Sequence, residues 1–193
     1  MKKSVVDLSD LQEIAPFFKT KFGIFLGKKI IKWLGIKKVN DIHAKHCHLR
    51  GADFTTALLQ DPLMDIKYNV HNAELLDTLP EGAFITISNH PFGHIDGIML
   101  IDIFAARRSD FAVMVNGVLT KIGAMEDNFI SVQPDSKNRG ANVANVNGVR
   151  TSLERLKSGH PMGFFPAGAI SFYNKEKKRV MDLDWTLSVI RLI

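Results

Sequence analysis

The chain has 193 residues, of which 46% are hydrophobic and 23% are charged. This composition is typical of a globular protein, and the length suits one hydrophobic core with a terminal extension. The longest apolar runs are far shorter than the roughly 18 residues of a membrane-spanning helix, so we expect no transmembrane segment. Acidic residues near the N-terminus interrupt the apolar region that a signal peptide requires. The single cysteine excludes an internal disulfide. We therefore expect a cytoplasmic protein.

The excess of positive charge is concentrated near the N-terminus. Seven lysines and no acid lie between residues 14 and 40. On a helix, the apolar side chains of this range recur every three or four residues, with lysines on the other side, which predicts a basic amphipathic helix. We interpret residues 1–40 as a membrane-contact segment and residues 41–193 as a separate domain. The predicted lipid contacts are Phe18, Phe22, Phe25, Lys28, Lys32 and Trp33.

This N-terminal segment has two alternative interpretations. The apolar stripe of an amphipathic helix can instead pack on the core of its own domain. A nucleic-acid-binding role is less favoured, because no recognition motif or platform of aromatic and basic strand residues accompanies the lysines.

Strand and helix patterns alternate after residue 40. A short helix is predicted at 72–79, capped by Asn72 and ended by Pro80. Apolar runs predict buried strands at 83–87, 111–115, 129–132 and 162–165. Helical spacing predicts helices at 95–106, followed by Arg107 and Arg108, and at 141–156, with a helical turn at 118–122. The alternation is typical of an α/β domain with a mostly parallel sheet flanked by helices.

The C-terminal end shows an unfinished pattern. Another apolar-periodic helix begins near Trp185 and reaches the last residue without a glycine, a capping residue or a polar tail. We therefore expect that the chain is truncated and that the reading frame continues into at least one more strand.

The first chemically distinctive loop is residues 88–96, SNHPFGHID, directly after a predicted strand. Ligands of open α/β sheets bind at such loops. Asp96 follows His90 across a bend that contains proline and glycine, so its carboxylate can hold one imidazole nitrogen while the other faces the cleft as a base. The alternative is a loop histidine beside an N-capping aspartate.

A second loop, residues 163–171 with sequence GFFPAGAIS, follows the last predicted strand. Its proline and glycines bring backbone N–H groups close to the cleft, where they can hold an oxyanion or a substrate oxygen. A Pro-x-Gly turn is common, so this loop has meaning only together with the first one.

The pair of blocks NHPFGHIDG and FFPAGAIS resembles the glycerolipid and lysophospholipid acyltransferase superfamily, and is most similar to its hemolysin-like, ornithine-lipid-type bacterial branch. The resemblance extends from about residue 79 to the C-terminus. It implies an acyltransferase with His90 as general base and Asp96 as its orienting partner. It also implies direct transfer from acyl-CoA or acyl-carrier protein, without a bound cofactor or an acyl-enzyme, and peripheral attachment to the inner face of the cytoplasmic membrane. The residues expected to bind substrate are Asn89, Gly93, His94, Phe165, Pro166, Ala167 and Gly168.

Three departures from the superfamily pattern bear on the acceptor. Five residues separate His90 from Asp96, where four are commonest, and Ala167 replaces the usual glutamate. Residues 129–134, FISVQP, lack the arginine that glycerol-phosphate acyltransferases carry after the third strand. Lys137 and Arg139 follow and are candidate phosphate ligands, with solvated loop cations as the alternative. We therefore expect an amine or lysolipid acceptor rather than glycerol phosphate.

Other functional sites are less favoured by the sequence. Zinc ligands could come from the cluster His43, His46, Cys47 and His48, and a metal-dependent hydrolase could use His90, His94 and Asp96, but neither set has a recognised spacing. No serine elbow and no tuned cysteine nucleophile are evident, and we expect no metal site. A basic run could bind an acidic carrier protein or CoA phosphates, or be solvated: Lys175, Lys177, Lys178 and Arg179. The competing function is a catalytically inactive lipid-binding module of acyltransferase-like fold.

Overall fold

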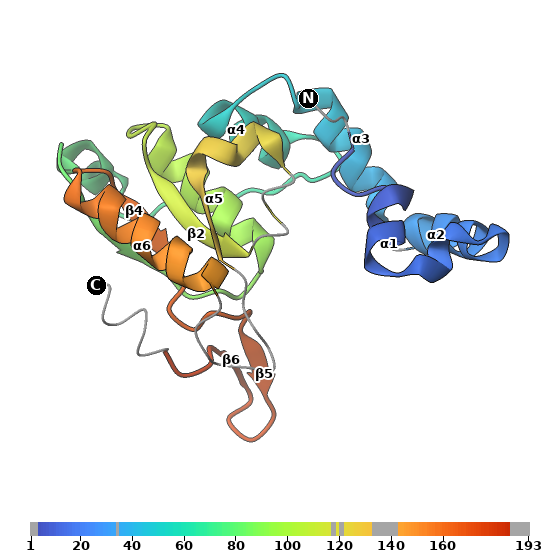
Figure 1. The fold of residues 1–193 in the computed structure, drawn as a ribbon. Helices are drawn as coiled ribbons and strands as arrows, with labels where there is room; N and C mark the ends of the chain where they lie inside the picture. Colours follow the sequence, from blue (N-terminus) through green and yellow to red (C-terminus); the bar gives the residue numbers. More distant parts are fainter. Residues whose placement is uncertain (1–3, 34, 117–118, 120–121, 133–142, 186–193) are drawn as a thin grey trace.

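A computed structural model describes residues 4–33, 35–116, 119, 122–132 and 143–185 (Figure 1). Its centre is a parallel sheet of four strands, β1 (Ile85–Ile87), β2 (Ala112–Asn116), β3 (Phe129–Val132) and β4 (Met162–Phe164). Their spatial order is β1-β4-β2-β3. The predicted α/β class with a parallel sheet is confirmed, and each of the four predicted strands is present.

Helices cover both faces of this sheet (Figure 1). On one face lie α4 (Gly51–Gln60) and α5 (His94–Ala105), and on the other lies α6 (Val143–Lys157). Successive side chains of β2 point to opposite faces of the sheet, as strand geometry requires. Val113 and Val115 belong to the larger core below α4 and α5, whereas Met114 packs with β4 residues towards α6.

The strand order places the two distinctive loops side by side. The chain runs from β1 through α5 to β2 and β3, and then returns through α6 to insert β4 between β1 and β2. In the register of the sheet, Ile87 at the end of β1 lies opposite Phe164 at the end of β4. Because both strands are parallel, the loops that follow them leave the sheet at the same edge.

An arginine network closes the opposite edge of the sheet. The Arg108 guanidinium donates to both carboxylate oxygens of Asp110, at 3.0 and 2.9 Å, and to the carbonyls of Gly82 and Gly159, at 2.9 and 3.2 Å. These acceptors precede β1, β2 and β4. The bond from Arg108, supported by His160, lowers the pKa of Asp110 to about 2. The network therefore ties together the amino ends of three neighbouring strands.

The N-terminal region is a series of short helices rather than one. It comprises α1 (Leu8–Ile14), the 3-10 helix η1 (Pro16–Lys19), α2 (Lys21–Trp33) and α3 (Ile36–His46), and α3 joins the projecting pair α1 and α2 to the rest of the molecule (Figure 1). The predicted basic amphipathic helix is present as α2, but it is shorter than the range of the lysines. Gly35 adopts a left-handed conformation, φ 68°, between α2 and α3, and Phe18 lies in η1. The division at residue 40 falls within α3 and stays a prediction.

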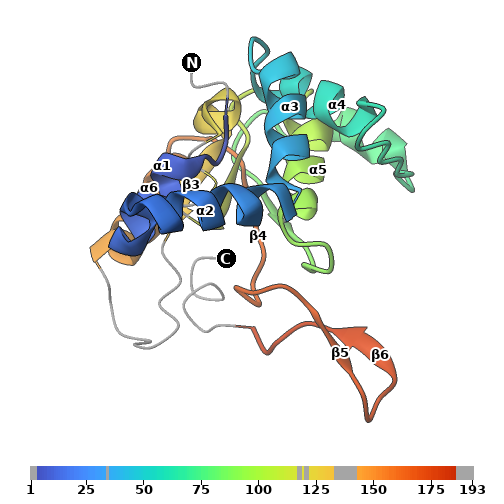
Figure 2. The ribbon, with the colours of Figure 1, turned by 90° about the vertical axis from the view of Figure 1, so that its right-hand side faces the viewer.

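Two further segments differ from expectation. The helix predicted at 72–79 is the 3-10 helix η2 (Ala73–Thr78), and Asn72 precedes it in a left-handed conformation without a side-chain cap. After β4 the chain forms an antiparallel hairpin, β5 (Phe172–Asn174) and β6 (Arg179–Met181), which the sequence analysis missed. This hairpin extends away from the sheet and its helices in both views (Figures 1 and 2).

Several expectations concern residues beyond the described ranges. They are the C-terminal helix after Trp185, most of the turn at 118–122, and the cations Lys137 and Arg139. A further 3-10 helix, η4 (Gly123–Asn128), leads into β3.

Within the described ranges, no helix combines the length and the hydrophobicity that crossing a bilayer requires.

Candidate active site

The structure brings His90 and Asp96 together in the loop after β1. Nδ1 of His90 lies 3.0 Å from Oδ2 of Asp96, and the two side chains are 19% and 11% exposed. The Asp96 N–H donates to the Gly93 carbonyl at 3.0 Å, which closes the bend between them. Because the partner of Nδ1 is a carboxylate, the ring hydrogen of a neutral imidazole belongs on Nδ1. Nε2 is then the nitrogen that can accept a proton from a substrate.

Gly93 makes this bend possible. Its φ of 65° and ψ of −127° belong to a region that L side chains rarely adopt, and a Cβ atom there would lie 2.9 Å from Cδ1 of Ile170. The bend also turns the Phe92 N–H towards Asp96, where it donates to the same Oδ2 at 2.9 Å. One carboxylate oxygen therefore receives two donors, which hold it in place.

The loop after β4 contacts the histidine directly. The ring of Phe165 stacks on the ring of His90, with centroids 4.2 Å apart and planes inclined by 27°. The Ser171 N–H donates to the His90 carbonyl at 2.9 Å. Gly168, at φ 65°, turns the loop and donates its N–H to the Phe165 carbonyl. The two loops that the sequence singled out thus form one structure at the carboxyl edge of the sheet.

The other predicted substrate-binding residues lie at different depths. Asn89, His94 and Gly168 are exposed, whereas Gly93, Pro166 and Ala167 are buried. Ala167 is only 5% exposed, so its side chain belongs to the packing below the loop. The substrate-binding roles of these residues stay predictions.

Asp182, just after β6, is a site residue that the sequence analysis missed. Its Oδ1 accepts hydrogen bonds from the Ser171 hydroxyl and, at 3.4 Å, from the His90 N–H. Its Oδ2 is buried and has no hydrogen-bond partner among the residues that the structure describes. Asp182 lies 92 residues from His90 in the chain, so no local motif could reveal it.

The histidines near Cys47 do not form a metal site. His43 is 2% exposed and lies edge-on to the ring of Phe54, His46 bonds to Asp61 at 2.8 Å, and the Cys47 thiol donates to a backbone carbonyl. In the part of the chain that the structure describes, no three His, Cys, Asp or Glu side chains are grouped to hold a metal ion.

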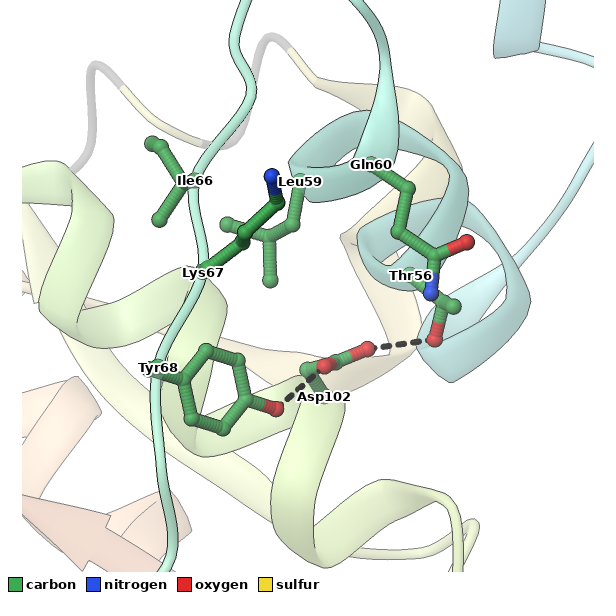
Figure 3. Close-up of a pocket in the computed structure, with 7 residues that line it drawn as sticks. All are labelled: Thr56, Leu59, Gln60, Ile66, Lys67, Tyr68 and Asp102. Carbon is green, nitrogen blue, oxygen red and sulfur yellow. Dashed lines mark hydrogen bonds between the residues drawn. The ribbon is translucent and has the colours of Figure 1, made fainter.

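A pocket of about 360 Å³ lies apart from His90, between α4, α5 and residues 66–68 (Figure 3). On its floor the Asp102 carboxylate accepts hydrogen bonds from the hydroxyls of Thr56 and Tyr68, and also from Thr55 at 3.2 Å. Burial, together with Asp102, raises the pKa of Tyr68 above its ordinary value. With three hydroxyls on its carboxylate, Asp102 connects these elements and is poorly placed to act as a base. The lining residues are Thr56, Leu59, Gln60, Ile66, Lys67, Tyr68 and Asp102.

Comparison with known protein families gives a match over most of the chain. The family model described as Acyltransferase matches residues 11–192, which is almost the entire chain. No curated protein and no solved structure is significantly similar to the chain. The matched range includes both loops of the site, and the parallel sheet that carries them is consistent with an acyltransferase-like fold. The chain belongs to the acyltransferase family.

Proposed function

We propose that the protein transfers a fatty acyl group from acyl-CoA or acyl-carrier protein to a hydroxyl or amine of a lipid acceptor, with His90 as general base. The observation that carries this proposal is the His90–Asp96 pair, 3.0 Å apart and nearly buried, at the carboxyl edge of the sheet. This is where α/β proteins bind ligands. In a member of the acyltransferase family, a base held by a carboxylate suits direct attack of an acceptor on a thioester.

The proposed reaction is a single transfer without an acyl-enzyme. Nε2 of His90 removes the proton of the acceptor hydroxyl or amine while the acceptor oxygen or nitrogen attacks the thioester carbonyl. Asp96 stabilises the imidazolium that forms, and backbone N–H groups of the second loop stabilise the oxyanion. The carbon–sulfur bond then breaks, and the imidazolium returns the proton to the thiolate. The products are the acylated acceptor and a free thiol.

Exposed aromatic side chains on α2 support attachment to a membrane surface. Phe22, Phe25 and Trp33 are 66%, 55% and 85% exposed, and Lys28 and Lys32 are exposed on the same helix. In contrast, Phe18 is partly buried, and its ring lies close to Gly27 of α2. We propose that α2 contacts the inner face of the cytoplasmic membrane through these aromatic and basic side chains.

The acceptor in this proposal is an amine or a lysolipid, as in the hemolysin-like branch. The buried Ala167 supports this choice, because the position that usually carries a glutamate offers no carboxylate to an acceptor.

The test measures thiol release from acyl thioesters, with a membrane lipid extract as acceptor and mass spectrometry of the product. His90→Ala should lower turnover by about 10² to 10⁴. His71→Ala, an exposed histidine outside the site, is the matched control and should leave turnover unchanged. Full activity in a folded His90→Ala protein would refute the mechanism. Binding of acyl lipids without turnover would instead identify an inactive lipid-binding module.

A further inference from the structure

The β5–β6 hairpin exposes apolar side chains on both of its faces. Tyr173 lies opposite Val180, and these side chains are 60% and 59% exposed. Phe172 lies opposite Met181 on the other face and is 42% exposed. More exposed apolar side chains occur beside the hairpin: Ile170, Leu183 and Trp185.

No described core element covers the side chains of the hairpin strands. Among the described elements, no helix and no other strand packs extensively on β5 or β6, in agreement with the way the hairpin projects in Figures 1 and 2. An isolated two-stranded hairpin is marginally stable in water. The hairpin therefore has apolar surface that a partner could cover with a gain in stability.

The tip of the hairpin is positively charged. Lys175, Lys177, Lys178 and Arg179 are all exposed around a single acid, Glu176. None of these four cations forms an ion pair with a described acidic residue. A partner of the hairpin should therefore be both apolar and negatively charged.

The base of the hairpin is bonded to the catalytic loop. Ser171, which precedes β5, donates its N–H to the His90 carbonyl, and Asp182, which follows β6, accepts from the His90 N–H. Asp182 also accepts from the Ser171 hydroxyl. Both ends of the hairpin are thus fixed to the segment that carries the proposed base.

We propose that the β5–β6 hairpin is a membrane-contact element, distinct from α2, that inserts its aromatic side chains among the headgroups of an anionic lipid surface. Aromatic residues flanked by cations are suited to the interface of such a membrane. An acidic carrier protein would satisfy the cations but would leave both apolar faces in water, so the lipid surface fits better. The hairpin then holds the His90 loop at the surface where a lipid acceptor resides. This last step rests on the proposed function, whereas the contact itself does not require turnover.

The first experiment is flotation of the full chain with phosphatidylcholine vesicles that contain or lack phosphatidylglycerol. Lys177→Gln/Lys178→Gln should weaken binding to the anionic vesicles by about 30-fold. Lys67→Gln/Lys157→Gln removes the same charge from exposed positions elsewhere and should have little effect. Phe172→Ser/Tyr173→Ser should weaken binding to the vesicles at low and at high salt alike, because it removes apolar contacts rather than charges.

A second measurement does not depend on how these variants fold. A polarity-sensitive fluorophore is attached to Val180→Cys in a Cys47→Ser background, with Val146→Cys, 51% exposed on α6, as the matched control. Anionic vesicles should shift the emission of the hairpin label to the blue and shield it from an aqueous quencher. The label on α6 should show neither effect.

The outcomes separate the two proposals. Unchanged flotation of both hairpin variants, or a hairpin label that stays accessible to the quencher on bound vesicles, would overturn the membrane contact. If the hairpin variants lose binding to a carrier protein, or lose self-association, while they still bind vesicles, the membrane contact is overturned. The hairpin would then bind a carrier protein or a second copy of the chain. Hairpin-dependent binding without any acyl transfer would retain the membrane contact and reject the proposed function.

Discussion

Replacing Asp96 by asparagine separates the charge of this residue from its geometry. One oxygen of Asp96, Oδ2, accepts from both His90 Nδ1 and the Phe92 N–H, at 3.0 and 2.9 Å. An asparagine carbonyl oxygen in the same place can accept both bonds, whereas its amide group would repel both donors. The two donors therefore select the orientation of the new side chain. The imidazole should keep its hydrogen on Nδ1 and its Nε2 free.

The expected fall of kcat in Asp96→Asn comes only from the lost negative charge of the carboxylate. A hydrogen bond to a charged group contributes about 1.5–3 kcal/mol and a neutral one about 0.5–1.5 kcal/mol. The difference between the middles of these ranges, about 1.2 kcal/mol, corresponds to a roughly eightfold lower kcat. Asp96→Ala loses the entire bond and the fixed orientation of the imidazole, so kcat should fall about 100-fold or more. The Phe92 N–H left behind can bond to water, because Phe92 is 72% exposed.

The assay is thiol release at saturating acyl donor, with Tm recorded for each variant. Both variants should unfold within a few degrees of the unmodified chain, so that kcat reports the site. If Asp96→Asn lowers kcat as much as Asp96→Ala does, the two donors do not orient the side chain. If Asp96→Asn has full activity, the carboxylate charge has no catalytic role.

Three further predictions concern the supports of the site and the opposite edge of the sheet. Gly93→Ala should reduce kcat and Tm for two reasons: its Cβ would lie 2.9 Å from Cδ1 of Ile170, and alanine rarely adopts a φ of 65°. Gly93→Ala/Ile170→Ala removes the steric clash but not the unfavourable φ, so it should recover only part of the Tm. The pKa of Asp110, held at about 2 against an ordinary 3.8, predicts about 2 kcal/mol of stability that is complete above pH 4 and lost as the pH falls towards 2. Denaturant titrations at several pH values should show this loss in the unmodified chain and not in Asp110→Asn. Asp182→Ala should lower kcat about tenfold, since the hairpin no longer holds the catalytic loop, and Asp182→Asn should restore most of it, because an amide oxygen can accept the same bonds.

The parts of the fold that could be predicted are those with a local apolar signal. Strands of a parallel sheet are buried on both faces and appear in the sequence as short continuous apolar runs, as at residues 111–115. The β5–β6 hairpin has no buried face, so no such run marks it, and charged residues follow Asn174 directly. Gly35 was visible within a helical pattern, but only the positive φ observed there shows that the helix is broken.

The same limit applies to the site. The contact between His90 and Asp96 could be predicted because the bend that joins them is local. The stacking of Phe165 on His90 follows from two loops at the ends of adjacent strands. Asp182 could not be found, because its bond to the first loop depends on where the hairpin returns. Arg108 was expected only at the end of a helix. Its hydrogen bonds to residues that precede three strands depend on the assembled sheet.

The two edges of the sheet differ in what their hydrogen bonds hold. At the amino edge, Arg108 satisfies carbonyls that precede neighbouring strands and pairs with a carboxylate that stays charged well into acid. At the carboxyl edge, glycines 93 and 168 adopt positive φ, and the carboxylates of Asp96 and Asp182 accept hydrogen bonds from the segment that carries His90. The hydrogen bonds of Arg108 therefore fix the amino ends of three strands, whereas the hydrogen bonds of Asp96 and Asp182 fix the two loops of the proposed site at the far edge of the same sheet.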